Sequence, residues 1–553
     1  MNKKLFALLA IIVLLVAACQ ASPAEQVEVT RVVSEQIEVT RIVEGEVQTE
    51  VVEVTRLVDT PDEEPQAEEP EQGDSDGVLT IAKGAIPTTG DPGYDTGAWS
   101  LAAYMYVFDT LVVFEDGEVQ PSIATSWEAI DEQTWEFTLR DDVTFQNGEP
   151  LDANAVKFTI DRIMNPDEAV PWAGLMGPIE STEVIDETTI QIRTSEPFGP
   201  LVQKLLVAFI IPPSYYEEVG KEAFAQAPVG SGPFQWVDFD PITHLTVEPW
   251  AESWRWEGNE PGVTAVTWRK MPEASTRVAA LAAGEVDVAE DIPAETISQL
   301  ESLDIQIMSQ PIAQTMVVNL RNTWDTPLQE MLVRQALNYA IDKQAIADSI
   351  LSGHATLVDS QLIGADSFGY NPDLEPYPYD PDRARELLAE AGYPDGFEMT
   401  YHFSIGRYPK DKEVSEVIAA QLAEVGVQAN LEYLENVVFS QMARDGTIGP
   451  MSIYGWQSMP AMDINQPIPF FQCETPRENF CDEELDRLID EMEQELDPVA
   501  REANAQEMAA YLAETAPVIF LWQFHTIYGI QPYVEGFVPS PAAAINLTQV
   551  SLN

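Results

Sequence analysis

The stretch Val333-Arg334-Gln335-Ala336-Leu337-Asn338-Tyr339-Ala340-Ile341-Asp342-Lys343 carries the most specific pattern in this chain. If it is helical, its apolar residues gather on one face, as in a helix that packs on a core. The pattern continues on both sides of this stretch. We therefore expect one long helix from Leu328 to Leu351.

Helices and strands alternate along most of the chain outside this stretch. Cap residues and glycines mark the ends of the expected helices, and period-two alternation marks the strands. The expected strands are Val78–Ala82 and Trp135–Leu139, and the further helices are 152–164, 274–283, 380–391, 413–425, 483–496 and 498–515. Such a mixture over nearly 480 residues predicts an α/β architecture in at least two lobes.

Several further motifs follow one another in a fixed order. They are Pro121-Ser122-Ile123-Ala124-Thr125-Ser126-Trp127-Glu128, Phe137–Arg140, Phe145–Gly148, Ala227-Pro228-Val229-Gly230-Ser231-Gly232-Pro233-Phe234, Leu281–Asp287, Tyr379–Pro381 and Leu387–Tyr393. Together with the stretch at 333–343, this series resembles the family 5 extracellular solute-binding proteins, the peptide and nickel binders of ABC importers. The resemblance runs from about residue 78 to the end of the chain. We expect Gly230 and Gly232 to permit a tight turn with unusual φ values.

The resemblance implies a two-lobed periplasmic-binding-protein fold (type II, large peptide-binder class) whose lobes close over a ligand around a hinge. The chain would begin in lobe I, cross near Asn319, build lobe II and return. The expected bounds are 78–110, 227–319 and 517–553 for lobe I, 111–226 for an extra subdomain of lobe I, and 320–516 for lobe II.

Two positions bear on ligand binding through the same resemblance. In dipeptide-binding members an arginine lies fourteen residues before a helix glutamine and binds the ligand carboxylate, and Arg407 has this spacing from Gln421. Those members also carry an aspartate three residues after a Gly-Trp pair, where it holds the ligand's amino group. Here Met459 occupies that position, and Asp463 is the nearest carboxylate. Arg407 and Asp463 are therefore candidate ligand residues, with a surface arginine as the alternative for Arg407, and the departure at Met459 weakens a strict dipeptide reading.

Three aromatic residues, Trp99, Tyr454 and Trp456, are candidates for the wall of an apolar cleft. Tryptophan is more often a core residue than a ligand contact, so both roles stay open for each of them.

No enzyme motif is present in the sequence. It lacks a GxxxxGK[ST] loop, an HExxH, a CxxC and a GxSxG motif, and Val229–Pro233 is not a phosphate loop because Pro233 removes a donor. The four histidines are scattered, so we expect no metal and no cofactor. A formal net charge of −65 argues against nucleic acid as a partner, since phosphate binding needs lysine and arginine.

The N-terminus predicts export. Lys3 and Lys4 precede an apolar run, Leu5–Val16, that is too short to span a bilayer, and Val16-Ala17-Ala18-Cys19 resembles a bacterial lipobox. Residues 1–19 are therefore expected to be a lipoprotein signal peptide with lipid on Cys19. An ordinary signal peptide with a chance cysteine is the alternative.

Residues 20–77 are expected to form a disordered stalk. Three copies of a short repeat, at 27–31, 37–41 and 52–56, alternate like strands but are unevenly spaced with no evident partner strands. The tract from Asp59 to Asp76 is strongly acidic and contains no basic residue, so it cannot bury enough apolar surface to fold.

The two remaining cysteines, Cys473 and Cys481, would meet an oxidising compartment outside the cell. We expect a disulfide that closes a small loop, with two buried thiols as the alternative.

These observations predict a monomeric, extracytoplasmic, lipid-anchored binder that delivers peptides or peptide-like solutes to the permease of an ABC transporter. One alternative is the same fold with another solute, such as a nickel chelate or an oligosaccharide. The other is a surface sensor or adhesin that has lost transport. A hydrolase is disfavoured by the absent nucleophile motifs.

The lipid anchor gives a first testable prediction. Replacement of Cys19 by Ala removes the thiol that would carry the lipid, so the variant should be released into the medium or stay unprocessed. Fractionation followed by immunoblotting measures this. Membrane retention equal to that of the parent would refute the anchor.

Overall fold

The computed structural model describes residues 30–43, 46–59, 77–115, 117–256, 261–473, 475–477, 479–541 and 545–553. The chain divides into two compact units, residues 1–71 and residues 72–553. The predicted signal peptide and Cys19 lie outside the described residues.

In the first unit, β1 (Thr30–Val43) pairs antiparallel with β2 (Glu46–Asp59). The expectation of disorder is therefore wrong for these residues. The repeats do find a partner strand: Ile37, the first residue of the second repeat, lies opposite Val52, the first residue of the third. Only these first residues face each other, since residues 38–41 pair with 48–51 and residues 53–56 pair with 33–36.

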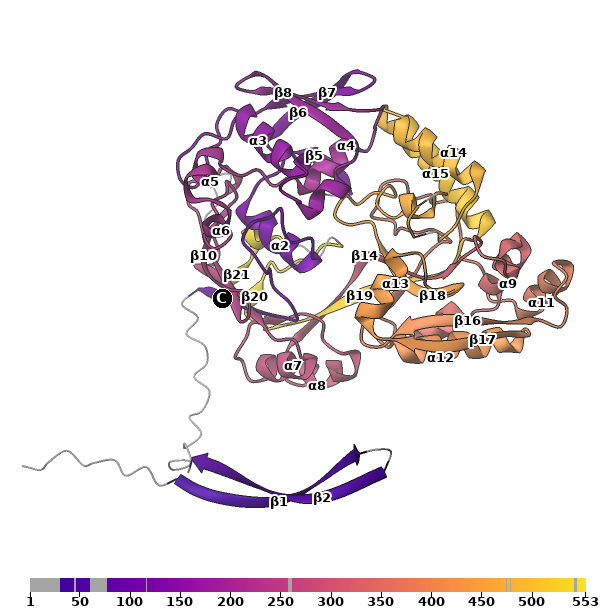
Figure 1. The fold of residues 1–553 in the computed structure, drawn as a ribbon. Coiled ribbons are helices and arrows are strands. Elements are labelled where there is room, and N and C mark those ends of the chain that lie inside the picture. The colour runs from indigo at the N-terminus through magenta and orange to yellow at the C-terminus, as the bar shows by residue number, and fades with distance from the viewer. Residues whose placement is uncertain are drawn as a thin grey trace, which may run out of the picture. The chain divides into compact units, whose positions relative to one another are not determined.

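The second unit is built on one long mixed sheet (Figure 1). Its strand order is β10-β11-β12-β3-β13-β19-β14-β18-β16-β17, and β15 pairs with β19. The bounds are β3 Val78–Lys83, β10 Phe234–Asp240, β11 His244–Pro249, β12 Ala265–Lys270, β13 Val288–Ala289, β14 Gln306–Leu320, β15 Ala355–Leu357, β16 Phe397–Ser404, β17 Val427–Leu434, β18 Met451–Gln457 and β19 Val518–Ile530.

A smaller antiparallel sheet has the order β6-β7-β9-β8. It consists of β6 Ala124–Asp131, β7 Thr134–Leu139, β8 Ile179–Asp186 and β9 Thr189–Thr194, and two short pairs are β4 Val112–Glu115 with β5 Glu118–Pro121 and β20 Val534–Glu535 with β21 Ser551–Leu552.

The helices lie around these sheets (Figure 1). They are α2 Ala98–Val107, α3 Ala153–Met164, α4 Leu201–Lys204, α5 Pro213–Val219, α6 Lys221–Phe224, α7 Ala274–Ala282, α8 Ile297–Glu301, α9 Met331–Tyr339, α10 Lys343–Ser349, α11 Pro381–Glu390, α12 Asp411–Glu424, α13 Asn436–Arg444, α14 Glu483–Gln494 and α15 Pro498–Thr515. The 3-10 turns are η1 Pro171–Leu175, η2 Leu205–Val207, η3 Trp254–Trp256, η4 Ala294–Thr296, η5 Pro327–Gln329, η6 Ile468–Phe471 and η7 Leu547–Gln549.

The long helix expected over 328–351 is wrong in one respect. The structure breaks it into η5, α9 and α10. Asp342 begins α10 as its N-cap, since its carboxylate accepts a hydrogen bond from the Ala345 amide at 2.9 Å. Its own amide donates to Gln421 Oε1, also at 2.9 Å. The apolar face continues through the break, so periodicity alone could not show it.

Two strands connect separate hydrophobic cores. One core contains Leu79, Phe137 and Tyr528, and a second contains Met316, Leu337 and Trp522. The strands β14 and β19 run through both, and their pairing is irregular between Pro311 and Thr315. The predicted lobe bounds stay a prediction. Along β14, Met308 packs against the first core and Met316 belongs to the second, so the strand passes from one core to the other between these residues.

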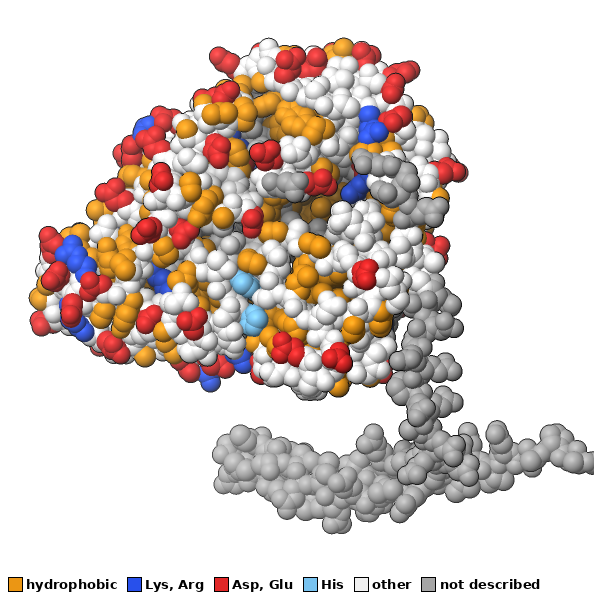
Figure 2. Space-filling view, turned by 180° about the vertical axis from the view of Figure 1, so that it is seen from behind, with side chains coloured by type: hydrophobic (Ala, Val, Ile, Leu, Met, Phe, Trp, Pro, Cys, Tyr) orange, Lys and Arg blue, Asp and Glu red, His pale blue; other side chains and the backbone are white. Residues whose placement is uncertain are grey.

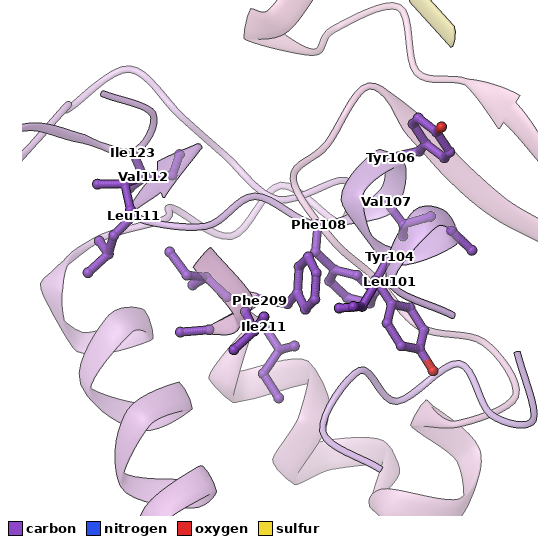
Figure 3. Close-up of a cluster of buried hydrophobic side chains, with 14 of the residues drawn as sticks. Leu101, Tyr104, Tyr106, Val107, Phe108, Leu111, Val112, Ile123, Phe209 and Ile211 are labelled. Carbon is purple, nitrogen blue, oxygen red and sulfur yellow. The ribbon is translucent and has the colours of Figure 1, made fainter. Parts of the chain in front are cut away.

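The predicted subdomain shares the core of the predicted lobe I. Figure 3 shows aromatic rings from α2 and from the segment after η2 facing each other in this core. Ring centres lie 6.1 Å apart for Tyr104 and Phe108 and 5.8 Å apart for Tyr104 and Phe209. The four-stranded sheet is separate, but the packing beneath it is continuous with that of β3.

Gly230 and Gly232 have no φ in the left-handed region, so the expectation of unusual φ values is wrong. Their role is close approach. A Cβ on Gly230 would lie 1.8 Å from the Val107 carbonyl oxygen, and one on Gly232 would lie 2.5 Å from that of Tyr106. The Gly232 amide donates to the Val107 carbonyl at 2.9 Å. Glycine is needed because the segment crosses the end of α2.

A disulfide joins Cys473 to Cys481, the pairing expected from the sequence. Around it, the Asn322 amide nitrogen donates to the Cys481 carbonyl at 2.8 Å. The Cys481 amide donates back to Asn322 Oδ1 at 2.9 Å. The loop between the cysteines is thus closed covalently and attached to the segment after β14.

Replacing Cys473 and Cys481 together by Ser should lower the free energy of unfolding by about 2–3 kcal/mol, since the short loop loses its covalent constraint in the unfolded chain. Urea denaturation followed by circular dichroism measures the change. Chemical reduction of the parent should reproduce it. A double variant as stable as the oxidised parent would contradict the prediction.

Candidate functional site

Arg407 lies between β16 and α12, in a turn fixed by Asp411. The Arg407 amide donates to Asp411 Oδ2 at 3.0 Å. Its guanidinium is held by three neighbours. Nε donates to the Tyr408 hydroxyl at 2.9 Å, and Nη1 donates to Asn436 Oδ1 at 2.9 Å and to Ser440 Oγ at 2.6 Å.

Three aromatic rings surround this guanidinium. Its central carbon lies 5.3 Å from the ring centre of Tyr408, 5.6 Å from Phe439 and 5.2 Å from Tyr454. Burial acts to lower the pKa of Arg407, but the interactions with Tyr408 and Tyr454 outweigh it, so the pKa is raised and the group stays cationic. Among the residues that the structure describes, no carboxylate forms an ion pair with it.

The Arg407 turn lies beside the strand pair that joins the two cores. The Tyr408 ring stacks on Phe524 of β19, with 6.4 Å between centres. The Tyr408 hydroxyl also accepts a hydrogen bond from the Gly455 amide of β18 at 2.9 Å. Arg407 is thereby placed next to the paired strands β14 and β19.

Tyr454 and Trp456 project from the same face of β18 but differ in exposure. Tyr454 is half-buried and belongs to the ring group around Arg407. Trp456 is only 3% exposed, packs on Phe470 and Phe471, and donates from Nε1 to Asn319 Oδ1 at 3.0 Å. Tyr454 is thus accessible in part, whereas Trp456 is buried and packs against it, with 4.7 Å between ring centres.

Asp463 does not lie where a ligand amine could reach it. It is 0% exposed, and both of its carboxylate oxygens accept from Arg501 Nη2 at 2.8 Å. Oδ1 also accepts from the Asn465 amide at 2.7 Å. Its acceptor sites are filled from inside the protein, which gives Asp463 a structural role in this structure.

Met459, at the position where dipeptide binders carry the amine-holding aspartate, is in an apolar contact. It is 5% exposed and clusters with Ala313 and Met462, and Phe114 packs against the group. Phe114 belongs to β4, in the predicted subdomain. An ammonium group would find no anion in this cluster.

The predicted lobes I and II also touch near Asp463, through residues that the sequence did not single out. Lys204 of α4 is buried, and its Nζ donates to Gln466 Oε1 at 3.3 Å. Burial lowers the pKa of Lys204 to about 8, against the attraction of Asp463 and Glu493. Nearby, the Gly199 amide donates to the Glu493 carbonyl at 2.7 Å. No sequence motif marks Lys204 because its partners are about 260 residues away.

A second contact joins the two predicted lobes at the surface, where Lys410 Nζ lies 3.6 Å from Glu295 Oε1. Trp99, the remaining aromatic candidate, is on α2 and 43% exposed. Of the five candidates, the structure brings Arg407, Tyr454 and Trp456 together, whereas Asp463 is paired with Arg501 and Trp99 lies on a separate helix.

A separate surface groove of about 740 Å³ lies between α3 and α5, away from these residues. It is lined by charged and aromatic side chains, including Lys157, Arg162 and Tyr216. Figure 2 shows acidic side chains spread over one face of the molecule with few basic ones among them. In the described part of the chain, no cluster of three or more His, Cys, Asp and Glu side chains could hold a metal ion. Likewise, none of its helices is long and apolar enough to cross a bilayer.

Replacing Asp463 by Asn should lower the free energy of unfolding by about 3–5 kcal/mol without any ligand, because Arg501 would keep a buried, unbalanced charge. Chemical denaturation of the ligand-free protein measures it. Glu180→Gln, which breaks an exposed pair with Arg193, is the matched control and should cost less than about 1 kcal/mol. A stable Asp463→Asn protein that has lost ligand binding would instead make Asp463 a ligand residue.

Comparison with known proteins agrees with this architecture. A model of the bacterial extracellular solute-binding proteins, family 5 middle region, matches residues 118–477. The glutathione-binding protein GsiB of Salmonella typhimurium is 32% identical over 363 residues, which are 65% of this chain and 69% of that protein.

Two solved structures share the fold of this chain. HbpA2 from Haemophilus parasuis has a TM-score of 0.76 and 26% identity, over 86% of this chain and 100% of its own. DppA from Helicobacter pylori, in complex with the peptide STSA, has a TM-score of 0.69 and 25% identity, over 86% and 98%. The predicted family and two-lobed α/β fold are confirmed, and the chain belongs to the bacterial extracellular solute-binding proteins of family 5.

Proposed function

We propose that this protein binds short peptides or peptide-like solutes through their carboxylate at Arg407 and delivers them to an ABC permease. One observation carries the ligand class. The half-buried guanidinium of Arg407 is oriented by three hydrogen bonds, but no described carboxylate pairs with it. The Tyr454 side chain is a further hydrogen-bond partner, and all of these partners are neutral, so the positive charge of Arg407 remains available to an anion.

Arginine suits this task better than lysine. Its planar group can make two parallel hydrogen bonds to a carboxylate, and the ring faces of Tyr408, Phe439 and Tyr454 keep it in place without competing for the anion. The relatives support the class. GsiB is named for glutathione, a tripeptide, and the DppA structure contains a peptide.

The amino end of the ligand has a weaker anchor in this proposal. Met459 is in an apolar cluster and Asp463 is occupied by Arg501. Recognition therefore rests on the carboxylate and on the half-buried Tyr454, while Trp99 is available on the other side of the crossing. A binder of this kind changes no covalent bond and gains affinity as its lobes exclude water.

The contacts between the two predicted lobes are the means of closure. Lys204 with Gln466 is buried, and Lys410 with Glu295 is exposed. Because the partners come from opposite sides of the β14–β19 crossing, they form and separate with lobe movement. We place the protein outside the cytoplasm as a monomer anchored by lipid on Cys19, and the permease is its protein partner.

Replacing Arg407 by Ala should weaken binding of a carboxylate-bearing peptide by about 2–5 kcal/mol, or some 30-fold to several thousand-fold, because the anion loses its partner. Arg407→Lys should recover part of this. Isothermal titration of Ala-Ala-Ala and its C-terminal amide measures both effects. The parent should prefer the free acid, and the Arg407→Ala protein should not distinguish the two.

Arg385→Ala serves as the control, since Arg385 is an exposed arginine paired with Asp382 on α11. It should bind like the parent. Equal affinity of the parent for acid and amide, or an Arg407→Ala protein that binds as the parent does, would overturn the carboxylate site.

A further inference from the structure

A second arginine, Arg477, shares the unusual environment of Arg407. Buried and half-buried arginines elsewhere in the described chain pair with carboxylates, as Arg501 does with Asp463, or donate to backbone carbonyls, as Arg334 does. Arg407 and Arg477 do neither with described residues. In a chain with 93 acidic and 28 basic residues, two half-buried guanidinium groups without a described carboxylate are a distinctive feature.

Both groups lie against one ring. The central carbon of Arg407 is 5.2 Å from the centre of Tyr454, and that of Arg477 is 5.7 Å from it. Nη1 of Arg477 also donates to the Tyr454 hydroxyl at 3.2 Å. The two guanidinium carbons are therefore no more than about 11 Å apart, since each lies within 6 Å of the same centre.

The guanidinium of Arg477 packs against two further aromatic rings. Its central carbon lies 4.1 Å from the ring centre of Phe470 and 5.2 Å from that of Trp456. Such contacts fix the plane of a guanidinium while leaving its edge free to donate. This gives buried Trp456 a function in the site, as a support for the cation.

The backbone of Arg477 is held as firmly as its side chain. It lies within the loop closed by the Cys473–Cys481 disulfide. Arg321 Nη2 donates to the Arg477 carbonyl at 3.0 Å. The disulfide loop thus presents a positioned cation on the ring that Arg407 also contacts.

Long-range electrostatics make these local cations necessary for an anionic ligand. A protein of net charge −65 repels an anion in solution, so binding of a second negative group requires a positive group in direct contact. We propose that Arg477 is a second anion-recognition residue and that the preferred solute carries two anionic groups.

A short acidic peptide is long enough to reach both cations. Residues of an extended chain span about 3.3–3.6 Å each, so two or three residues cover the upper limit of about 11 Å between the two guanidinium carbons. One anionic group of the solute is the C-terminal carboxylate at Arg407, and the other is an acidic side chain or a second free carboxylate at Arg477. This inference rests on the proposed function, because it assigns Arg407 the first carboxylate.

The test compares isosteric tripeptides. Isothermal titration of Glu-Ala-Ala and Ala-Glu-Ala, and of their Gln counterparts, measures the preference for a second anion. The parent should bind at least one acidic peptide about tenfold to a hundredfold more tightly than its Gln twin. Arg477→Gln should abolish that preference and leave the Gln peptides within about twofold of the parent. Arg477→Lys should restore part of it.

Arg487→Gln is the matched control, because Arg487 is an exposed arginine that pairs with Glu484 on α14. It should retain the preference. Thermal unfolding of each variant verifies the fold, and a destabilised Arg477→Gln protein is replaced in the comparison by Arg477→Lys. A parent that binds acidic and neutral peptides equally, or an Arg477→Gln protein that keeps the preference, would overturn the second site and leave the proposed function standing. A parent that binds no tripeptide would overturn both.

Discussion

The pairing of β14 with β19 is the constraint on which the rest of the structure depends. These two strands pass through both hydrophobic cores, and the strands of each core are added on either side of them. The hydrogen bonds between β14 and β19 also position the side chains on these two strands. Phe524 of β19 stacks on Tyr408, and the Tyr408 hydroxyl accepts a hydrogen bond from Arg407 Nε. The candidate site therefore takes its geometry from the same hydrogen bonds that connect the lobes.

Much of the fold was predictable from sequence because its signals are local. Asp152 caps α3 through the amides of Asn154 and Ala155, and α7, α11, α12, α14 and α15 begin and end within two residues of the expected bounds. The break between α9 and α10 escaped prediction because it depends on Gln421, which is distant in sequence. The hairpin of β1 and β2 escaped for a similar reason, since a strand is recognised from its partner.

The site was predictable only in part. Arg407 could be found by its spacing from Gln421. Asp463 could not be separated from a ligand residue until Arg501, 38 positions later, was seen to pair with both of its oxygens. Gly230 and Gly232 show the same limit. Two glycines so close together indicate a special requirement of the backbone. Only the neighbouring end of α2 shows that the requirement is room for close approach and not a positive φ angle.

The irregular pairing between Pro311 and Thr315 has a mechanical consequence. Between these pairs β14 has two residues more than β19, so the ladder of hydrogen bonds is interrupted there. Phe524 is the β19 residue opposite this interval, so Tyr408 and the Arg407 turn lie directly beside the interruption of the ladder. A change in the orientation of the lobes at this point would therefore act directly on the candidate site.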